Sequence, residues 1–589
     1  MSSTIPQDLP SPSSPKGKKN LGKPHSKTKN KLTAGRIAFL IHSYIGLKLS
    51  IIFSIVLLSG AFAVFHEEID WLLYAEKRVT PQSEKMNPGE VLDRLEDQLP
   101  GVGLSSFYTA ADRERTAATA LKSTPGGGFK VVHIDPYTGK YQGETNFLTV
   151  GSFIRVLHTN LFMPLIGRAF VNFFGVLCLI GLISGLIAYR RFWRKFFTLP
   201  KYRGVKFHRF LADLHKFVGL WSLWFVLIIG VSGSWWFYHN PLVLYKVAPA
   251  IMEPMPIDPA LTKGDLKKLG EGIPKRLSSA EIATAVKAHD PEFEITLMVQ
   301  PEHSGMAYRV RGTKHDLLTN RWDSSYYVHP FTGEIIGQRL MEEADALKRF
   351  DRAMEPLHYG TFGYSGWSDL LVKTIWFIFG MAMSLLAISG TVIYYKRTRS
   401  ATTRLLPSTL TGKRRTLKKI WIVIRPWGGP MSVFKYLNWL FIIIMCIGIN
   451  IGFKLQREGT ANSGFQYQQQ QVGEWRVTLN AVLGLLEKDL NPITPGRRTN
   501  INAYIEGDFS AIKFMYVDFK KPRTMRAPGF VVHGVTGNLH AHGTVPKELP
   551  DNAELWLTIE DWYGNYYQTS WPLLPDGVNT IDKRVAVIN

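Results

Sequence analysis

The feature that most constrains this chain is the grouping of its apolar residues into five long stretches. Each reaches the roughly 18 residues that a helix needs to cross the hydrocarbon core of a bilayer. The 589-residue chain is 45% hydrophobic and 20% charged, so the overall totals look ordinary and only the segregation is informative. We therefore predict five transmembrane helices, at Leu40–Phe65, Leu161–Tyr189, Phe217–Tyr238, Leu370–Tyr395 and Tyr436–Phe453.

Three of the connecting segments carry basic residues and no acidic ones. Gly17–Arg36 holds seven Lys and Arg, Arg190–Arg209 holds eight, and Lys396–Lys435 holds eleven. Because such segments stay on the cytoplasmic side, we expect the N-terminus inside and the C-terminus outside. The same segments account for the net charge of +23, so we predict contact with membrane lipid and no nucleic-acid partner.

The first and third apolar stretches share one pattern of histidines. His42 and His66 are 24 residues apart, and so are His215 and His239. Glycines follow the first histidine at the fourth and eighteenth positions in both stretches. The two stretches are therefore expected to be copies of one helix.

The second and fourth stretches also match each other. Leu-His precedes each of them, at His158 and His358, and Ser-Gly recurs near their ends, at Gly185 and Gly390. The chain thus contains two copies of one helical hairpin. Repeats of this kind often build a site at their interface.

The segments between the spans on the outer side repeat as well. Asp135–Gly139 and His329–Gly333 both end in Thr-Gly after a strand-like stretch, and a weaker copy lies at Val532–Gly543. Pro and Gly at these positions are typical of hairpin turns. Helix-like stretches precede the copies, for example residues 279–288 and 479–487. We predict three small α+β modules outside the membrane.

These motifs together resemble the PepSY-associated transmembrane family over about residues 36–397. The resemblance rests on the His-x3-Gly opening, the Ser-Gly and His at the far end of the first helix, the Leu-His before the second, and the Pro-x-Thr-Gly hairpins. It implies a bacterial, iron-regulated inner-membrane protein similar to haem-containing reductases of ferric siderophores. The fifth helix and the third module depart from the family's usual four-helix pattern.

The predicted fold class is a membrane all-α core, made of two repeated helical hairpins and a fifth transmembrane helix, with three small α+β PepSY-like external modules. The expected order is a disordered basic cytoplasmic tail, then spans alternating with outer modules and basic cytoplasmic loops. The boundaries are 1–35 for the tail, 36–66, 151–190, 215–239, 367–395 and 436–454 for the spans, 67–150, 240–366 and 455–589 for the modules, and 191–214 and 396–435 for the loops.

Six histidines at the ends of these spans are the candidate cofactor ligands. Haem iron accepts axial imidazoles, and one histidine from each of two facing helices would complete a haem b site. We predict His42 with His215 on the inner side and His158 with His358 on the outer side, with His66 and His239 as the alternative outer pair. One or two haems would then carry electrons outward to reduce a ferric siderophore or another ferric chelate for iron acquisition.

Other readings stay open. Glu67, Glu68 and Glu355 either orient an outer imidazole or are simply exposed acids. The chain has no P-loop, no dinucleotide fingerprint and no Cys-x-x-Cys, so electrons would come from a cytoplasmic protein or from quinol. The rival functions are a non-redox membrane protein whose modules bind a ligand, in which the histidines are interfacial, and a transporter component.

A further cluster of histidines lies in the third module. His533, His540 and His542 are spaced to meet on a hairpin, where they either bind a metal ion or are solvated surface residues.

Overall fold

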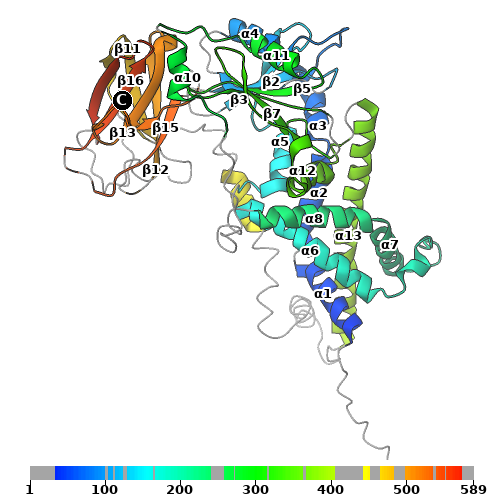
Figure 1. Cartoon of the computed structure of the whole chain (residues 1–589). Coiled ribbons are helices and arrows are strands. Elements are labelled where there is room, and N and C mark those ends of the chain that lie inside the picture. The colour runs from blue at the N-terminus through cyan, green and yellow to red at the C-terminus, as the bar shows by residue number, and fades with distance from the viewer. Residues whose placement is uncertain are drawn as a thin grey trace, which may run out of the picture.

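The computed structural model places the apolar helices beneath an α+β domain, with a separate β-rich region at its side (Figure 1). It describes residues 33–48, 50–99, 104–109, 113–123, 129–163, 166–239, 258–270, 272–314, 318–362, 366–404, 442–451, 464–482, 496, 498–534, 539–548, 550 and 552–573.

Two helices are long and apolar enough to cross a membrane by themselves. They are α6 (Ile166–Ala188) and, within α13 (Gly366–Arg404), the segment Ser368–Ile393. Two bent pairs meet the same test together, which gives up to four spans among the described residues. The fifth predicted span is described only as the apolar helix Ile442–Ile451, and the rest of it lies outside the described residues.

The two bent pairs occupy the first and third apolar stretches. The first is α1 (Ala34–Lys48) with α2 (Ser50–Ala63), bent by 72°, and the second is α7 (Phe207–Trp221) with α8 (Leu223–Tyr238), bent by 67°. In each pair the first helix ends six residues after its histidine, His42 or His215, and the next begins two residues later. In a straight helix His66 would lie about 36 Å from His42, and the bend makes this distance shorter.

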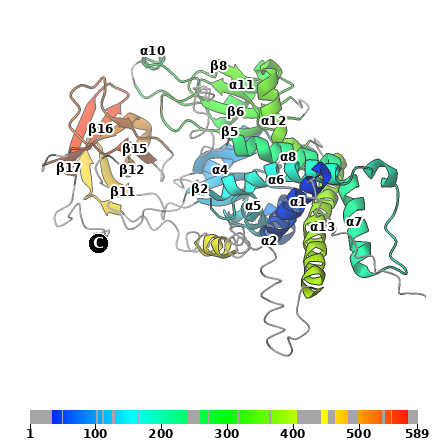
Figure 2. The ribbon, with the colours of Figure 1, turned by 90° about the horizontal axis from the view of Figure 1, so that it is seen from below.

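The two halves of the chain pack across each other through small residues. α2 of the first half runs along α13 of the second, and α8 of the second half runs along α6 of the first (Figure 2). A Cβ at Gly175 would lie 2.5 Å from the backbone of Gly233, and one at Gly380 would lie 2.9 Å from the Cβ of Ala61. Side chains larger than these would force the helices apart.

A short amphipathic helix precedes each long helix. α5 (Val150–Asn160) leads into α6, and α12 (Ala346–Tyr359) leads into α13. Both stop at a residue in the left-handed conformation, Leu161 with φ 50° and Gly360 with φ 70°. His158 and His358 therefore lie in the last turn of helices that end in the same way.

The first two outer modules form a single antiparallel sheet in the order β4-β3-β2-β1-β5-β6-β7-β8. The modules join at β1 and β5, where Phe107 is in register with Val299. The strands are β1 (Leu104–Thr109), β2 (Ala118–Ser123), β3 (Phe129–Ile134), β4 (Tyr141–Asn146), β5 (Glu294–Val299), β6 (Tyr308–Thr313), β7 (Ser324–Val328) and β8 (Ile335–Arg339).

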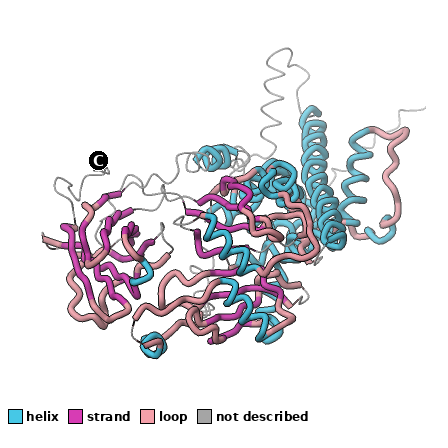
Figure 3. The backbone as a smooth tube through the Cα atoms, turned by 90° about the horizontal axis from the view of Figure 1, so that it is seen from above, coloured by secondary structure: helices cyan, strands magenta, loops and turns pink. Residues whose placement is uncertain are grey.

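The helices α4 (Pro88–Gln98) and α11 (Ser279–His289) cover one face of this sheet, opposite the apolar helices (Figures 1 and 3). The carboxylate of Asp93 in α4 accepts hydrogen bonds of 2.8 Å from the backbone N–H groups of Ser279 and Ala280. One module thus caps the first turn of the other module's helix. The shared core contains Leu95, Val132, Ile282, Met298 and Val310.

The two predicted Pro-x-Thr-Gly hairpins are confirmed. Gly139, with φ 68°, turns β3 into β4, and Gly333, with φ 77°, turns β7 into β8. Each donates its N–H to the residue four positions earlier, Asp135 or His329. The turn of the third copy lies outside the described residues.

The prediction of a third α+β module is wrong for the described residues. These form a five-stranded and a four-stranded antiparallel sheet that share one core, and 464–573 holds no α-helix where it is described. Leu479, expected in a helix, lies in β11 (Trp475–Val482), while 483–487 are outside the described residues. Buried Trp475, Val477 and Leu479 alternate with less buried neighbours, and that period of two is typical of a strand.

The remaining strands of this sandwich are, in order, β9 (Gly464–Gln466), β10 (Gln470–Val472), β12 (Arg498–Glu506), β13 (Ile512–Asp518), β14 (Phe530–Val531), β15 (Leu539–Thr544), β16 (Glu554–Asp561) and β17 (Tyr566–Pro572).

Candidate functional site

The structure brings His42 of α1 and His215 of α7 together, one from each half of the chain. Their ring centres are 6.3 Å apart. His42 Nδ1 lies 2.9 Å from the carbonyl oxygen of Gly181 in α6, and His215 Nδ1 lies 2.9 Å from the hydroxyl of Ser389 in α13. Each ring therefore contacts a polar group of its own half through Nδ1 and lies next to the histidine ring of the other half.

His158 and His358 form a second pair of the same design at the other end of the helices. Their ring centres are 6.2 Å apart. His158 Nδ1 lies 2.8 Å from the carbonyl oxygen of Val56 in α2, and His358 Nδ1 lies 2.7 Å from the hydroxyl of Ser232 in α8. The structure thus brings together both of the histidine pairs predicted first, His42 with His215 and His158 with His358.

The hydrogen bonds fix the tautomer of all four rings. A carbonyl oxygen only accepts, so the Nδ1 atoms of His42 and His158 must carry the proton. The hydroxyls of Ser232 and Ser389 donate to the carbonyls of Ile228 and Leu386 in their own helices. They therefore accept from His358 and His215. In each ring Nε2 keeps the lone pair, which is the arrangement that second-shell partners give to a metal-ligating histidine.

The spacing of each pair suits one metal ion between two imidazoles. A metal–imidazole bond is about 2.0–2.1 Å, so two rings on opposite sides of one ion have their centres about 6 Å apart. Glycines make room beside the rings: a Cβ at Gly60 would lie 2.6 Å from His158 Cε1, and one at Gly185 would lie 3.2 Å from His42 Cε1. The donor set and its surroundings fit a bis-histidine haem.

His66 and His239, the alternative outer pair, have only local Nδ1 contacts. Their Nδ1 atoms lie 2.9 Å and 3.2 Å from the carbonyls of Ala63 and Trp235, three and four residues earlier in the chain. The ring contacts found in the described part of the chain include none between these two histidines. The geometry therefore favours His158 and His358 as the outer pair.

A cavity of about 250 Å³ opens next to the outer pair, beneath the α+β domain. It is lined by His158, His358 and His66, by the basic side chains of Arg113, Arg155, Arg321 and Lys373, by the carboxylates of Glu67, Glu355 and Asp369, and by Trp322 and Trp376 among others.

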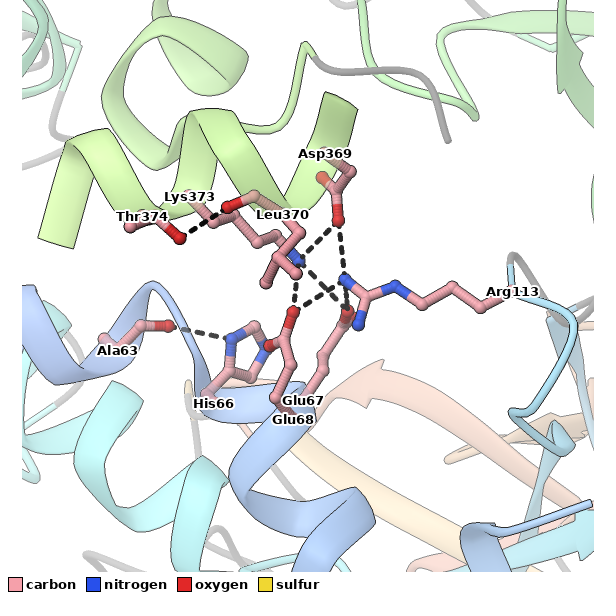
Figure 4. A network of polar contacts seen from close by, with 9 residues as sticks. All are labelled: Ala63, His66, Glu67, Glu68, Arg113, Asp369, Leu370, Lys373 and Thr374. Atoms are coloured by element: carbon pink, nitrogen blue, oxygen red, sulfur yellow. Dashed lines mark hydrogen bonds and ion pairs between the residues drawn. The ribbon is translucent and has the colours of Figure 1, made fainter. Parts of the chain in front are cut away.

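An ion-pair network joins the two halves at this cavity (Figure 4). Arg113 lies 2.8 Å from both Glu68 and Asp369, and Lys373 lies 3.1 Å from Glu68 and 3.3 Å from Asp369. Figure 4 also shows Glu67 and His66 beside these groups. Glu68 thus pairs with cations, and Glu355 accepts from the Asn320 amide at 2.9 Å.

The sequence prediction missed this network. Arg113 comes from the first outer module and gives no signal in the sequence. Lys373 did give one, because a cation inside the apolar stretch 370–395 is costly and marks a functional site by default.

The arrangement defines a membrane protein with two histidine pairs, each shared between the two halves of the chain, under an α+β domain. The model of the PepSY-associated TM region matches residues 39–397, which is more than half of the chain, and the chain belongs to this family. A separate model, of an uncharacterised conserved protein, matches residues 433–574. The first region covers the helices with the double α+β domain, and the second covers the apolar helix Ile442–Ile451 and the β-sandwich.

One curated relative is the uncharacterized protein PA4219 of Pseudomonas aeruginosa. It is 26% identical over 254 residues, which are 42% of this chain and 63% of that protein. The alignment therefore covers less than two thirds of the relative's length.

Proposed function

We propose that this chain is a bacterial inner-membrane haem b protein that moves electrons across the membrane to reduce a ferric chelate, such as a ferric siderophore, on the periplasmic side. The observation that carries the proposal is the pair of matched sites, His42 with His215 and His158 with His358. Their ring centres are 6.3 and 6.2 Å apart, and every Nδ1 is committed to an acceptor on another helix.

The chain's own groups would hold the cofactor and set its electronic properties. Haem iron, when bound, supplies a one-electron carrier whose potential depends on its axial ligands and burial. The acceptors of the four Nδ1 protons orient the rings and raise the basicity of Nε2. Because the pairs sit at opposite ends of the helices, one near the basic cytoplasmic loops and one at the cavity, they suit electron transfer from the inside outward.

The cavity beside the outer pair carries both cations and carboxylates. Arg113, Arg155, Arg321 and Lys373 line it together with Glu67, Glu355 and Asp369, and Arg113 and Lys373 pair with Glu68 and Asp369. We propose that the cations contact the carboxylate or hydroxamate oxygens of a ferric chelate. The haem propionates would compete for the same groups, so the basic side chains serve the cofactor, the substrate or both.

The proposed orientation follows the basic segments, with the N-terminus in the cytoplasm and the C-terminus in the periplasm. The electron donor would be a cytoplasmic protein or membrane quinol. Membrane lipid would contact the basic loops.

The test is a reduced-minus-oxidised absorption spectrum of the detergent-purified protein, followed by anaerobic mixing of the reduced protein with a ferric siderophore. We expect a b-type spectrum that returns to the oxidised form as the iron is reduced, at a rate that depends on chelate concentration. If the haem stays reduced after a ferric chelate is added, ferric chelates are not the substrate. If the protein is colourless, it is not a haem protein and the proposed redox function is wrong.

A second candidate function is non-redox binding of a ligand between the domains. A cavity of about 440 Å³ lies between the α+β domain and the sandwich, lined by Arg276, Glu302 and Phe514 among others. Chelate binding by a colourless protein, lost on Arg276→Ala, would favour this function over the first.

A further inference from the structure

Three histidines of the β-sandwich converge at one place, away from the helices. His533 follows β14 and pairs with His540 of β15 through two backbone hydrogen bonds of 2.9 and 2.8 Å. His542 lies two residues further along β15, so its side chain projects from the same face of the strand as that of His540. Leu539 and Ala541 point into the core instead.

The three rings are close enough to share one ion. Their centres are 4.3, 5.4 and 5.0 Å apart, and one nitrogen of each lies within 4.8 Å of the others. Nitrogens bound at about 2.0–2.1 Å to one tetrahedral ion are about 3.3 Å apart, so small side-chain rotations close the set. All three residues are half-buried, which leaves the site open on one side.

Two of the rings are oriented by acceptors on other segments. The carboxylate of Glu302, from the α+β domain, lies 3.0 Å from His533 Nδ1, and the Asn500 side-chain oxygen lies 2.7 Å from His542 Nδ1. Both oxygens accept, so the Nδ1 atoms carry the protons and Nε2 is left for a ligand bond. This is the same arrangement that the structure shows at the paired histidines of the helices.

A cluster of surface histidines without a ligand explains this arrangement less well, because adjacent imidazoles repel one another when protonated. A shared metal ion avoids this repulsion, because imidazole binds metal in its neutral form.

We propose that His533, His540 and His542 bind one divalent transition-metal ion of the kind that imidazole prefers, with Glu302 and Asn500 orienting two of the ligands. Imidazole suits Zn²⁺, Fe²⁺, Ni²⁺ and Cu²⁺ better than Mg²⁺ or Ca²⁺. Because Glu302 belongs to the α+β domain, an ion held here also links the sandwich to that domain. The site does not depend on the proposed haems.

The test titrates the full-length protein with Zn²⁺ by calorimetry and counts bound metal after gel filtration. The protein is purified in detergent through a tag without histidines and is first stripped with a chelator. We expect the wild type to bind one more Zn²⁺ per chain than His540→Ala/His542→Ala. Affinity should fall as pH drops from about 7.5 to 5.5, since the imidazoles must be unprotonated.

Two further variants separate a metal site from a general structural role. Glu302→Gln should weaken Zn²⁺ binding by about 10- to 100-fold, as is typical when the partner of a ligating histidine is lost. His208→Ala, at an exposed position at the start of α7, should change nothing.

The proposal is overturned if the wild type binds no Zn²⁺, or if His540→Ala/His542→Ala binds as much as the wild type. Thermal unfolding of the metal-free proteins checks that the variants fold. If the double variant does not, His542→Gln replaces it and must bind at least tenfold more weakly.

Discussion

The two halves of the helical region orient their histidine rings with different hydrogen-bond acceptors. In the first half the Nδ1 protons of His42 and His158 go to backbone carbonyls, and in the second half those of His215 and His358 go to serine hydroxyls. A carbonyl belongs to the backbone and no substitution removes it. A hydroxyl is a side-chain group that one substitution deletes. The second half is therefore the half in which one substitution can change the orientation of a ring without removing the histidine.

The largest expected effect is removal of a ligand from either half. If the histidine pairs hold haem as proposed, His158→Ala or His358→Ala should each lower the haem content by about one per chain, because the outer site needs both ligands. Haem quantified per chain in detergent is the measurement, and His239→Ala, an exposed neighbour, is the control. Unchanged haem in both variants would refute the outer pair.

The next effect concerns the ion-pair network that joins the halves. Lys373 is 4% exposed and faces Glu68 and Asp369. Lys373→Met should destabilise the protein by about 3 kcal/mol, at the low end for breaking a buried pair, since Arg113 still offsets the acids. Thermal unfolding in detergent measures this. Lys268→Met, in a surface pair, should leave the melting temperature unchanged, and an equal loss in both variants would argue against a special role for the network.

A pH effect is expected from a buried histidine of the first module. His133 in β3 is fully buried with Nε2 2.8 Å from the Thr145 hydroxyl, and burial lowers its pKa to about 4. The unfolded chain binds this proton at about pH 6.5, so stability is full above that pH and falls toward pH 4, by up to about 3 kcal/mol. Unfolding measured from pH 7 to 4.5 should show this slope, and His133→Phe should flatten it. The same slope in the variant would assign it to other groups.

The glycines beside the rings offer a finer comparison. Gly60→Ala places a methyl 2.6 Å from the His158 ring and should reduce haem content, whereas Gly46 has nothing within 4 Å and Gly46→Ala should not. Haem per chain is again the readout. Equal haem in the two variants would mean that Gly60 serves helix packing alone.

The smallest expected effect tests the serine of the second half directly. Ser232→Ala removes the acceptor of His358 Nδ1 and should loosen haem by about 10-fold, with a shift in the midpoint potential of one haem only. Ser234→Ala, whose hydroxyl bonds to the Gly230 carbonyl of its own helix, is the matched control. If a redox titration gives the same potentials for both variants, Ser232 does not tune the site through His358.

Much of the helical region was predictable, because apolar length, basic segments and repeated spacing are properties of the sequence itself. The repeat predicted that His42 pairs with His215 and His158 with His358, but it left His66 and His239 as an alternative outer pair, which only the structure separates. The bends after Lys48 and Trp221 were not predictable, because hydropathy records length and not direction. Arg113 reaches Asp369 across 256 residues, a contact that depends on how the domain sits on the helices.

Local features of the outer modules were also easier to predict than their packing. Their turns could be predicted because Gly139 and Gly333 take a positive φ. The pairing of β1 with β5, which joins the modules into one sheet, has no local signal in the sequence. At 475–482 the alternation of Trp, Val, Leu and Ala favoured a strand, whereas the apolar content of 479–487 led to the prediction of a helix that begins at Leu479.

Low-temperature electron paramagnetic resonance of the oxidised protein shows whether each histidine pair holds one haem, as proposed. We expect two low-spin ferric signals typical of two imidazole ligands, one of which disappears in His158→Ala/His358→Ala while the other remains. A protein that stays colourless when expressed with ample haem, or both signals persisting in that double variant, would refute the proposal.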